Sequence, residues 1–300
     1  MVERLRDAIN KARQSRDTGT TAPTLPPAPE APSSSSAQLR EAMVTAVTKS
    51  PGTSTNGRHA PIEDEWSAIR ELKLQAPRLE HHRIVSHKKV NPAHLAFDML
   101  RTRLLNMMRT NGWTRLGITS PTQGCGKSMV STNLALSLGH QNDLRAMLFD
   151  VDLRSPVLAK LLDVRERLAI SDFLHGQVDA RDYLRRAGSN LAFGLNSERH
   201  PGPSELFQNE RTKEVLGKTI ARYRPNIVVY DLPPVLVSDD VIAFLPHVDC
   251  VMMVVAAGRT TPKEITEAEQ LLADQTNFLG AMLNKSKEKG AGGYQYRGYY

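Results

Sequence analysis

Ser120-Pro-Thr-Gln-Gly-Cys-Gly-Lys-Ser128 joins an apolar run over residues 116–119 to a helical pattern over residues 129–138. Gly124 and Gly126 let the backbone turn its N–H groups inward, at the positive end of the helix that follows. The regular form of such a loop has an earlier glycine, and Pro121 stands in its place here. The segment predicts a phosphate-binding loop between a strand and a helix.

Acidic residues follow two other apolar runs. Asp150 and Asp152 come directly after residues 146–149, and Asp231 comes directly after residues 226–230. The carboxyl ends of parallel strands open on the ligand crevice of a sheet, and alternation places Asp150 and Asp152 on the same side. Each acid taken singly is equally well explained as a helix cap or turn residue. Together, behind a glycine loop, the three predict a site for phosphate and a cation.

Apolar strands alternate with helical patterns through the second half of the chain. We expect strands over residues 114–119, 145–150, 191–195, 226–231, 249–256 and 278–283, and helices over 128–139, 204–222, 239–244 and 263–274. Two further helices are expected upstream, over residues 63–74 and 93–108. This alternation predicts an α/β fold of the P-loop NTPase kind, with a mostly parallel sheet covered by helices on both faces.

The order of several motifs resembles the bacterial tyrosine kinase (BY-kinase) family, over roughly residues 90–300. The motifs are Gly124-x-Gly-Lys-Ser, Asp150-x-Asp-x-Arg154 with Pro156, Gly202-Pro-Ser-Glu-Leu206, Asp231-Leu-Pro-Pro-Val-Leu236, Gly258-Arg-Thr-Thr261 and Leu279-Gly-Ala-Met-Leu-Asn284. The resemblance implies a cytoplasmic autokinase of capsule and exopolysaccharide synthesis, which uses ATP and Mg²⁺. The shared order of these motifs is far more specific than any single motif.

The resemblance also assigns roles to residues. Lys127 would neutralise the phosphates, and Asp150 is the first candidate for the base that orients or deprotonates a tyrosine hydroxyl. The division of roles between Asp150 and Asp152 stays open. Arg154 would contact phosphate oxygens or a neighbouring subunit, or it would pair with a surface acid. Mg²⁺ would be held by Ser128, Asp152 and Asp231. The nucleotide would be bound by Gly124, Cys125, Gly126, Lys127, Ser128, Met129 and Asn284.

The end of the chain is rich in tyrosine. Tyr294, Tyr296, Tyr299 and Tyr300 are four of its seven tyrosines, and residues 285–300 have no apolar period. Such a segment is expected to be a flexible tail that can enter a neighbouring active site. By resemblance the four tyrosines are the phosphoacceptors, and each phosphate would add about −1.5 to −2 charges. A sticky terminus or aromatic side chains packed on the domain is the plainer interpretation.

The chain departs from the family pattern in three places. Leu232 replaces the usual threonine after Asp231. In the helix over residues 93–108 the family carries Glu-x-x-Arg-x-x-Arg for packing subunits into a ring, and this chain has Leu95, Asp98 and Arg101 there. Only the last position is kept, so we expect ring assembly to be weaker or to use other contacts. The third departure is Cys125 beside the phosphates, which we interpret as a small packing residue rather than a redox sensor.

Composition and charge are consistent with this interpretation. The net charge is +7, and residues 1–110 hold 17 Lys and Arg against 11 Asp and Glu, whereas residues 111–300 hold 22 against 21. The nearly neutral second part argues against a nucleic-acid surface on the core. Two cysteines predict a cytosolic chain without a disulfide framework. The longest apolar run, residues 251–257, is too short to span a membrane.

Four parts are predicted along the chain. Residues 1–16 form a short amphipathic helix, residues 17–62 a Pro-, Ser- and Thr-rich disordered linker, residues 63–284 the kinase domain and residues 285–300 the tail. The resemblance implies a homo-oligomer, a membrane-bound polysaccharide chain-length regulator as activator and an opposing tyrosine phosphatase. Recruitment to the inner face of the membrane would then come through the partner.

Two other functions remain open. A partition or septum-positioning ATPase has a similar fold, but such enzymes carry an extra lysine early in the loop, where this chain has Thr122. They also lack the Arg154 motif and the terminal tyrosines. A regulatory scaffold that binds ATP without transferring phosphate is favoured by the substitutions at Leu232, Leu95 and Asp98. Autophosphorylation would separate the kinase from the scaffold.

Overall fold

The computed structural model describes residues 62–88 and 93–286 of the 300-residue chain. In this part of the chain a seven-stranded sheet has the order β3-β4-β2-β5-β1-β6-β7. The strands are β1 (Arg115–Thr119), β2 (Ala146–Asp150), β3 (Arg185–Ala187), β4 (Leu191–Gly194), β5 (Ile227–Asp231), β6 (Cys250–Ala256) and β7 (Asn277–Asn284). Every neighbouring pair is parallel except β3 and β4. The expected mostly parallel sheet is confirmed.

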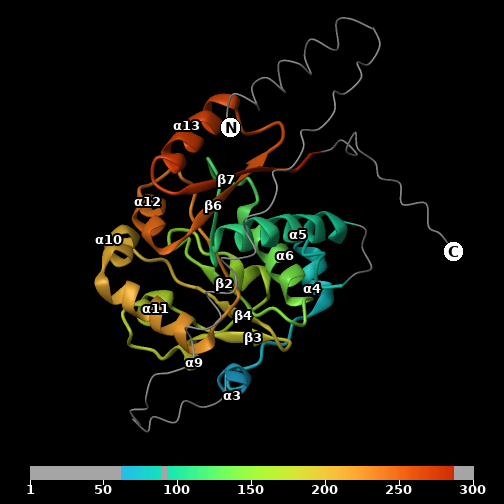
Figure 1. The fold of residues 1–300 in the computed structure, drawn as a ribbon, viewed down its shortest axis with the longest axis vertical. Coiled ribbons are helices and arrows are strands. Elements are labelled where there is room, and N and C mark those ends of the chain that lie inside the picture. Colours follow the sequence, from blue (N-terminus) through green and yellow to red (C-terminus); the bar gives the residue numbers. More distant parts are fainter. Residues whose placement is uncertain (1–61, 89–92, 287–300) are drawn as a thin grey trace, which may run out of the picture. The chain divides into compact units, whose positions relative to one another are not determined.

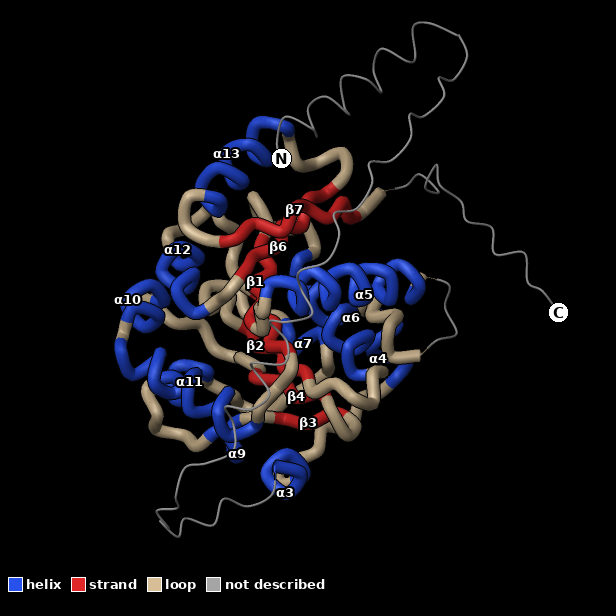
Figure 2. Tube along the Cα trace, viewed as in Figure 1, coloured by secondary structure: helices blue, strands red, loops and turns tan. Residues whose placement is uncertain are grey.

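Helices cover both faces of this sheet (Figures 1 and 2). On one side lie α4 (Ala76–His81), α5 (His94–Asn111), α6 (Lys127–Gly139) and α7 (Leu158–Leu161). The elements on the other side are α3 (Ile62–Ser67), α8 (Ile170–Leu174), α9 (Ala180–Tyr183), α10 (Pro203–Gln208), α11 (Glu210–Tyr223), α12 (Asp240–Phe244), the 3₁₀ turn η1 (Leu245–His247) and α13 (Pro262–Ala273). The described residues therefore form three layers.

Strand alternation builds a separate apolar core on each face. Leu148 and Val229 point to the core under α5 and α6, whereas Phe149 and Tyr230 point to the core under α10 and α11. The rings of Phe149 and Tyr230 stack with their centroids 5.6 Å apart. Because both faces are covered, the central strands read as continuous apolar runs rather than alternating ones.

Helix α6 is buried along almost its whole length. It packs against α5 on one side and against β1, β2 and β5 on the other. Its side chains from Val130 to Leu138 are all buried. Such a helix cannot shift without disturbing the core, so the loop at its amino end has a fixed support.

The prediction of one continuous helix over residues 204–222 is wrong. The segment is divided between α10 and α11 at Asn209, whose backbone is extended with φ −69° and ψ 131°. The Asn209 side chain accepts a hydrogen bond from the Arg211 N–H at 2.8 Å and so caps α11. A capping amide satisfies an N–H at the start of a helix, and this favours a new helix start over a continuous turn.

The expected helix over residues 63–74 is also wrong after Ser67. Leu72 N–H donates to the Arg186 carbonyl at 2.7 Å, and Arg186 N–H donates to the Arg70 carbonyl at 2.9 Å. The chain from Arg70 to Leu72 thus runs along the edge strand β3. Pairing with a sheet edge from more than one hundred residues away overrides the local helical pattern.

Other predictions lie outside the described residues. These are the amphipathic helix over residues 1–16, most of the linker over residues 17–62, and the four tyrosines of the tail. Among the helices of residues 62–88 and 93–286, none is long and apolar enough to cross a membrane.

Candidate nucleotide and phosphoryl-transfer site

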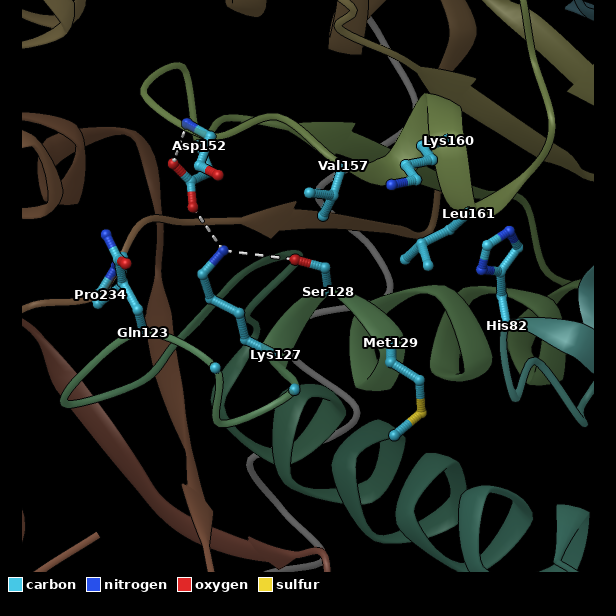
Figure 3. Close-up of a pocket in the computed structure, with 13 residues that line it drawn as sticks. His82, Gln123, Lys127, Ser128, Met129, Asp152, Val157, Lys160, Leu161 and Pro234 are labelled. Carbon is cyan, nitrogen blue, oxygen red and sulfur yellow. Dashed lines mark hydrogen bonds and ion pairs between the residues drawn. The ribbon is translucent and has the colours of Figure 1, made fainter. Parts of the chain in front are cut away.

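The glycine loop connects β1 to α6 as predicted. Gly124 and Gly126 have φ values of +78° and +93°, a region that strains residues with a Cβ atom. Gly126 is the residue immediately before α6, and its conformation aims the loop at the first turn of the helix. A cavity of about 480 Å³ opens beside the loop, and its lining includes Gly124, Lys127 and Ser128 (Figure 3). The loop therefore borders a space large enough for a ligand.

Lys127 is the first residue of α6, and its ammonium group points toward the ends of β2 and β5. Its Nζ lies 2.7 Å from Asp152 Oδ2, 3.7 Å from Asp231 Oδ2 and 3.4 Å from Ser128 Oγ. Burial would lower the pKa of Lys127, but the carboxylates of Asp231 and Asp152 outweigh that effect and raise it. The side chain is only 10% exposed, so this positive charge is held for partners inside the site.

Asp150 ends β2 and is fully buried. Its Oδ2 accepts hydrogen bonds from the N–H groups of Val157 and Leu158, at 3.1 and 2.9 Å, where α7 begins. Its Oδ1 is buried without a hydrogen-bond partner. Burial and the charge of Asp231 raise the pKa of Asp150 well above its ordinary value, against the Leu158 N–H, which lowers it. A fixed carboxylate of raised pKa is a capable proton acceptor.

Asp231 ends β5, and its backbone is in register with that of Asp150 on β2. Its Oδ1 accepts from the Ser131 hydroxyl at 3.1 Å, and its Oδ2 has no hydrogen-bond partner. Burial raises the pKa of Asp231, whereas the charge of Lys127 and the Ser128 hydroxyl act in the opposite direction. Asp150, Asp152, Asp231 and Lys127 together form what we call the lysine cluster, with three carboxylates for one ammonium.

The lysine cluster suits a hard cation. Two buried carboxylate oxygens, Asp150 Oδ1 and Asp231 Oδ2, lack a hydrogen-bond partner. Ser128 Oγ belongs to the same group of side chains, since it lies 3.4 Å from Lys127 Nζ. Oxygen atoms of this kind are the ligands that Mg²⁺ prefers. Across residues 62–88 and 93–286, no group of three His, Cys, Asp or Glu side chains is arranged to hold a metal ion unaided. Mg²⁺ bound largely through phosphate oxygens and water is consistent with both observations.

Arg154 lies in a second cluster. Its Nε and one terminal nitrogen donate to the two oxygens of Asp240, at 2.5 and 3.0 Å. Ser204 Oγ donates to Asp240 Oδ1 at 2.7 Å, and Ser238 Oγ donates to Asp240 Oδ2 at 2.8 Å. We call Arg154, Asp240, Ser204 and Ser238 the arginine cluster. The structure shows Arg154 paired with an acid, which is the buried Asp240 rather than the expected surface acid, and a catalytic role for Arg154 stays a prediction.

The remaining predicted nucleotide residues lie on or near the loop. Met129 lines the cavity, and Cys125 is fully buried, with its Sγ donating to the Thr122 carbonyl at 3.3 Å. Asn284 ends β7, and its Nδ2 donates to the Cys125 carbonyl at 2.9 Å. The structure thus places Asn284 against the outer side of the loop. Burial of the thiol agrees with Cys125 as a packing residue.

The other two departures from the family pattern have different surroundings. Leu232 is fully buried in the core on the α10 and α11 side of the sheet. Arg101 donates to Asp98 Oδ1 at 2.7 Å and to the Ser137 hydroxyl at 2.8 Å, which ties α5 to α6. Leu95 is 54% exposed. Asp98 therefore holds Arg101 inside the same chain.

Sequence reasoning missed several residues of the site. His82, Lys160 and Pro234 line the cavity, and Asp240 pairs with Arg154 across 86 residues of chain. Pro234 could have been found, since it follows Asp231 in the quoted motif. No local pattern marks the other three, because their positions depend on how distant segments pack.

Comparison with known proteins agrees with the geometry. No family model matches the chain. It is 31% identical to the tyrosine-protein kinase wzc of Salmonella typhi over 242 residues, which is 79% of this chain and 33% of that protein. It is 27% identical to the tyrosine-protein kinase YwqD of Bacillus subtilis over 192 residues, which is 60% of this chain and 76% of that protein.

Solved structures give the same result. The kinase domain of the Escherichia coli tyrosine kinase ETK is 28% identical, with a TM-score of 0.61, and the match covers 70% of this chain and 82% of that domain. The fold is that of P-loop NTPases. The chain spans about a third of the length of the enterobacterial relatives it matches. These relatives are named tyrosine-protein kinases, and the solved structure is a kinase domain, so this chain is similar to bacterial tyrosine kinases over the region of that domain.

Proposed function

We propose that the protein is an ATP-dependent protein-tyrosine autokinase that phosphorylates its own terminal tyrosines and regulates exopolysaccharide or capsule polymerisation and export. One observation carries the proposal. Lys127 at the start of α6 meets the carboxylates of Asp152, just after β2, and Asp231, at the end of β5, beside the phosphate loop. Phosphoryl transfer depends mainly on positioning and charge neutralisation, and this arrangement can supply both.

ATP would bind with its phosphates on the loop that ends at Gly126. Loop N–H groups and the positive end of α6 favour anionic oxygen atoms there. Lys127 would exchange its contact with Asp152 for phosphate oxygens. Mg²⁺, held by Ser128, Asp152 and Asp231 directly or through water, would supply charge neutralisation on the phosphates.

Asp150 is the best supported base. Its Oδ2 is fixed by two N–H groups, and its Oδ1 is left without a partner inside the site. An incoming tyrosine hydroxyl could donate to that free oxygen atom. A phenol with a pKa of about 10 need not be deprotonated before transfer, so orientation by a carboxylate is sufficient.

The acceptor and partner assignments rest on the resemblance. We propose Tyr294, Tyr296, Tyr299 and Tyr300 as acceptors, in a homo-oligomer. A membrane-bound chain-length regulator would activate the kinase and recruit it to the inner face of the membrane, and a tyrosine phosphatase would oppose it. The names of the relatives, which are tyrosine-protein kinases, support the activity but not these partners.

Phosphopeptide analysis of protein purified from cells tests the proposal. We expect phosphate on the four terminal tyrosines, and changing all four to phenylalanine should remove most of the label without weakening ATP binding. Undiminished label in the fourfold variant would contradict the acceptor assignment.

A second candidate is an ATP-binding regulator that does not transfer phosphate. The observation that favours it is the pairing of Asp98 with Arg101, since a family position implied in subunit packing is engaged inside one chain. Arg101 is 12% exposed at its side chain, which leaves little of it for a neighbour. Absence of phosphotyrosine from a protein that binds ATP would support this candidate.

A further inference from the structure

The outer side of the phosphate loop is held by the end of β7. Asn284 Nδ2 donates to the Cys125 carbonyl at 2.9 Å, and Lys285 Nζ donates to the Gly124 carbonyl at 2.6 Å. These two carbonyls belong to consecutive peptide groups of the loop. Two donors from one strand end therefore fix two neighbouring peptide planes.

The direction of these carbonyls determines the direction of two N–H groups. A trans peptide is planar, and its C=O and N–H bonds point in opposite directions. Holding the Gly124 carbonyl outward aims the Cys125 N–H inward, and holding the Cys125 carbonyl outward aims the Gly126 N–H inward. A phosphate loop binds its ligand through inward N–H groups of this kind.

The geometry of the two donors is well defined. Asn284 Oδ1 accepts from the Lys285 N–H at 2.8 Å, so only one orientation of the amide serves both contacts. Lys285 has φ +61°, in the left-handed region, which costs free energy in a residue other than glycine. A Cβ atom on Gly126 would collide with Asn284 Nδ2. The lack of a Cβ atom at Gly126 therefore leaves the space that the Asn284 side chain occupies.

We propose that Lys285, together with Asn284, is a positioning residue for the phosphate loop. It aims the Cys125 and Gly126 N–H groups at the nucleotide phosphates, and its positive charge polarises the peptide it holds. The proposal rests on the proposed nucleotide site but not on phosphate transfer. Because residue 285 is where the predicted tail begins, the same contact joins the start of the tail to the nucleotide site.

The test is the affinity of a fluorescent ADP analogue for the full chain in the presence of Mg²⁺. Lys285→Met keeps the length of the side chain but removes its charge and its donor. One lost hydrogen bond should weaken binding roughly three- to tenfold, and Lys285→Arg should restore most of the affinity. Lys213→Met on α11 is the matched control, because Lys213 is an exposed lysine paired with Glu210 on the helix layer opposite α6.

Asn284→Ala provides a second measurement and should weaken binding by a similar factor. The melting temperature without nucleotide should be unchanged in Lys285→Met, since Lys285 is exposed. Wild-type affinity in Lys285→Met would overturn the proposal while leaving the kinase proposal intact. Failure of the wild-type chain to bind the analogue would overturn both. Equal losses in Lys285→Met and Lys285→Arg would show a purely structural role and also overturn it.

Discussion

The lysine cluster and the arginine cluster are both buried at their acidic groups, yet they are completed to different degrees. In the arginine cluster each oxygen of Asp240 accepts two hydrogen bonds, one from Arg154 and one from a serine. In the lysine cluster three carboxylates share Lys127, and Asp150 and Asp231 each keep an oxygen atom without a hydrogen-bond partner. The carboxylate of the arginine cluster therefore has all its hydrogen-bond partners, whereas the lysine cluster has fewer positive charges than carboxylates.

The pKa shifts of the acids follow this difference. Burial raises the pKa of Asp240, but the hydrogen bonds from Arg154, Ser204 and Ser238 outweigh it and lower the pKa below its ordinary value. Burial and the charge of Asp231 raise that of Asp150. A buried carboxylate without compensation is costly, and proteins keep such groups mainly where a ligand or reaction uses them. The comparison favours the lysine cluster over the arginine cluster as the candidate functional site.

The largest effect is expected from Lys127→Met. The substitution removes the ammonium group that would neutralise the phosphates, so we expect phosphotyrosine to fall at least about a hundredfold. It also leaves three buried carboxylates without a cation. The apo protein should also lose about 3–5 kcal/mol of stability. Phosphotyrosine mass spectrometry and denaturant unfolding measure the two effects.

Lys127→Arg separates these two consequences. Arginine keeps the positive charge, so the variant should retain most of the stability, but its planar guanidinium cannot replace a compact ammonium on the phosphates. Wild-type phosphotyrosine in Lys127→Arg would contradict the role of the ammonium group.

Asp240→Asn removes the carboxylate at the centre of the arginine cluster. Arg154 would lose its bidentate carboxylate and keep its positive charge unpaired, and one acceptor oxygen would become an amide donor, so the free energy of unfolding should fall by about 1–2 kcal/mol. Nucleotide affinity should change little, since the hydrogen-bond partners of Asp240 are Arg154, Ser204 and Ser238 rather than Lys127 or the glycine loop. Unfolding with urea, followed by circular dichroism, would check the first value. A loss of ADP affinity without a loss of stability would show that the two clusters are not separate.

Asp150→Asn should have the opposite effect on stability. It removes one of three like charges and keeps an oxygen atom for the Val157 and Leu158 N–H groups. The apo protein should gain roughly 1 kcal/mol at neutral pH, as is common when a strained functional group is neutralised. A thermal melt without nucleotide would show it as a higher melting temperature. A lower melting temperature would mean that the Asp150 charge is already compensated.

The smallest effect concerns pH. A carboxyl group whose pKa is raised by folding stays protonated in the native state after the unfolded chain has lost its proton. Its contribution to stability therefore falls as pH rises above about 4, toward the folded pKa. Asp240, whose pKa is lowered, contributes stability above its ordinary pKa and loses it as pH falls. Plots of unfolding free energy against pH, measured from pH 4 to 8, should differ in slope between the wild type and Asp150→Asn. Parallel plots would contradict the raised pKa of Asp150.

Sequence reasoning predicted the parts of the site that follow strands. Lys127, Asp150 and Asp231 lie at the ends of local patterns, and a parallel sheet brings such ends to one edge. It failed where contacts join distant segments. The stretch from Arg70 to Leu72 pairs with β3, and Arg154 meets Asp240. Such contacts leave no periodic pattern, because they depend on which elements the topology makes neighbours.

We propose that the charge-deficient lysine cluster supports transfer of phosphate from ATP to tyrosine. The most direct measurement is quantitative phosphotyrosine analysis of wild type and Asp150→Asn, both purified from the same cells, alongside their affinities for Mg²⁺ and ATP. We predict terminal phosphotyrosine in the wild type, almost none in Asp150→Asn, and ATP binding in both. Equal phosphotyrosine in the two proteins, with binding intact, would contradict the account.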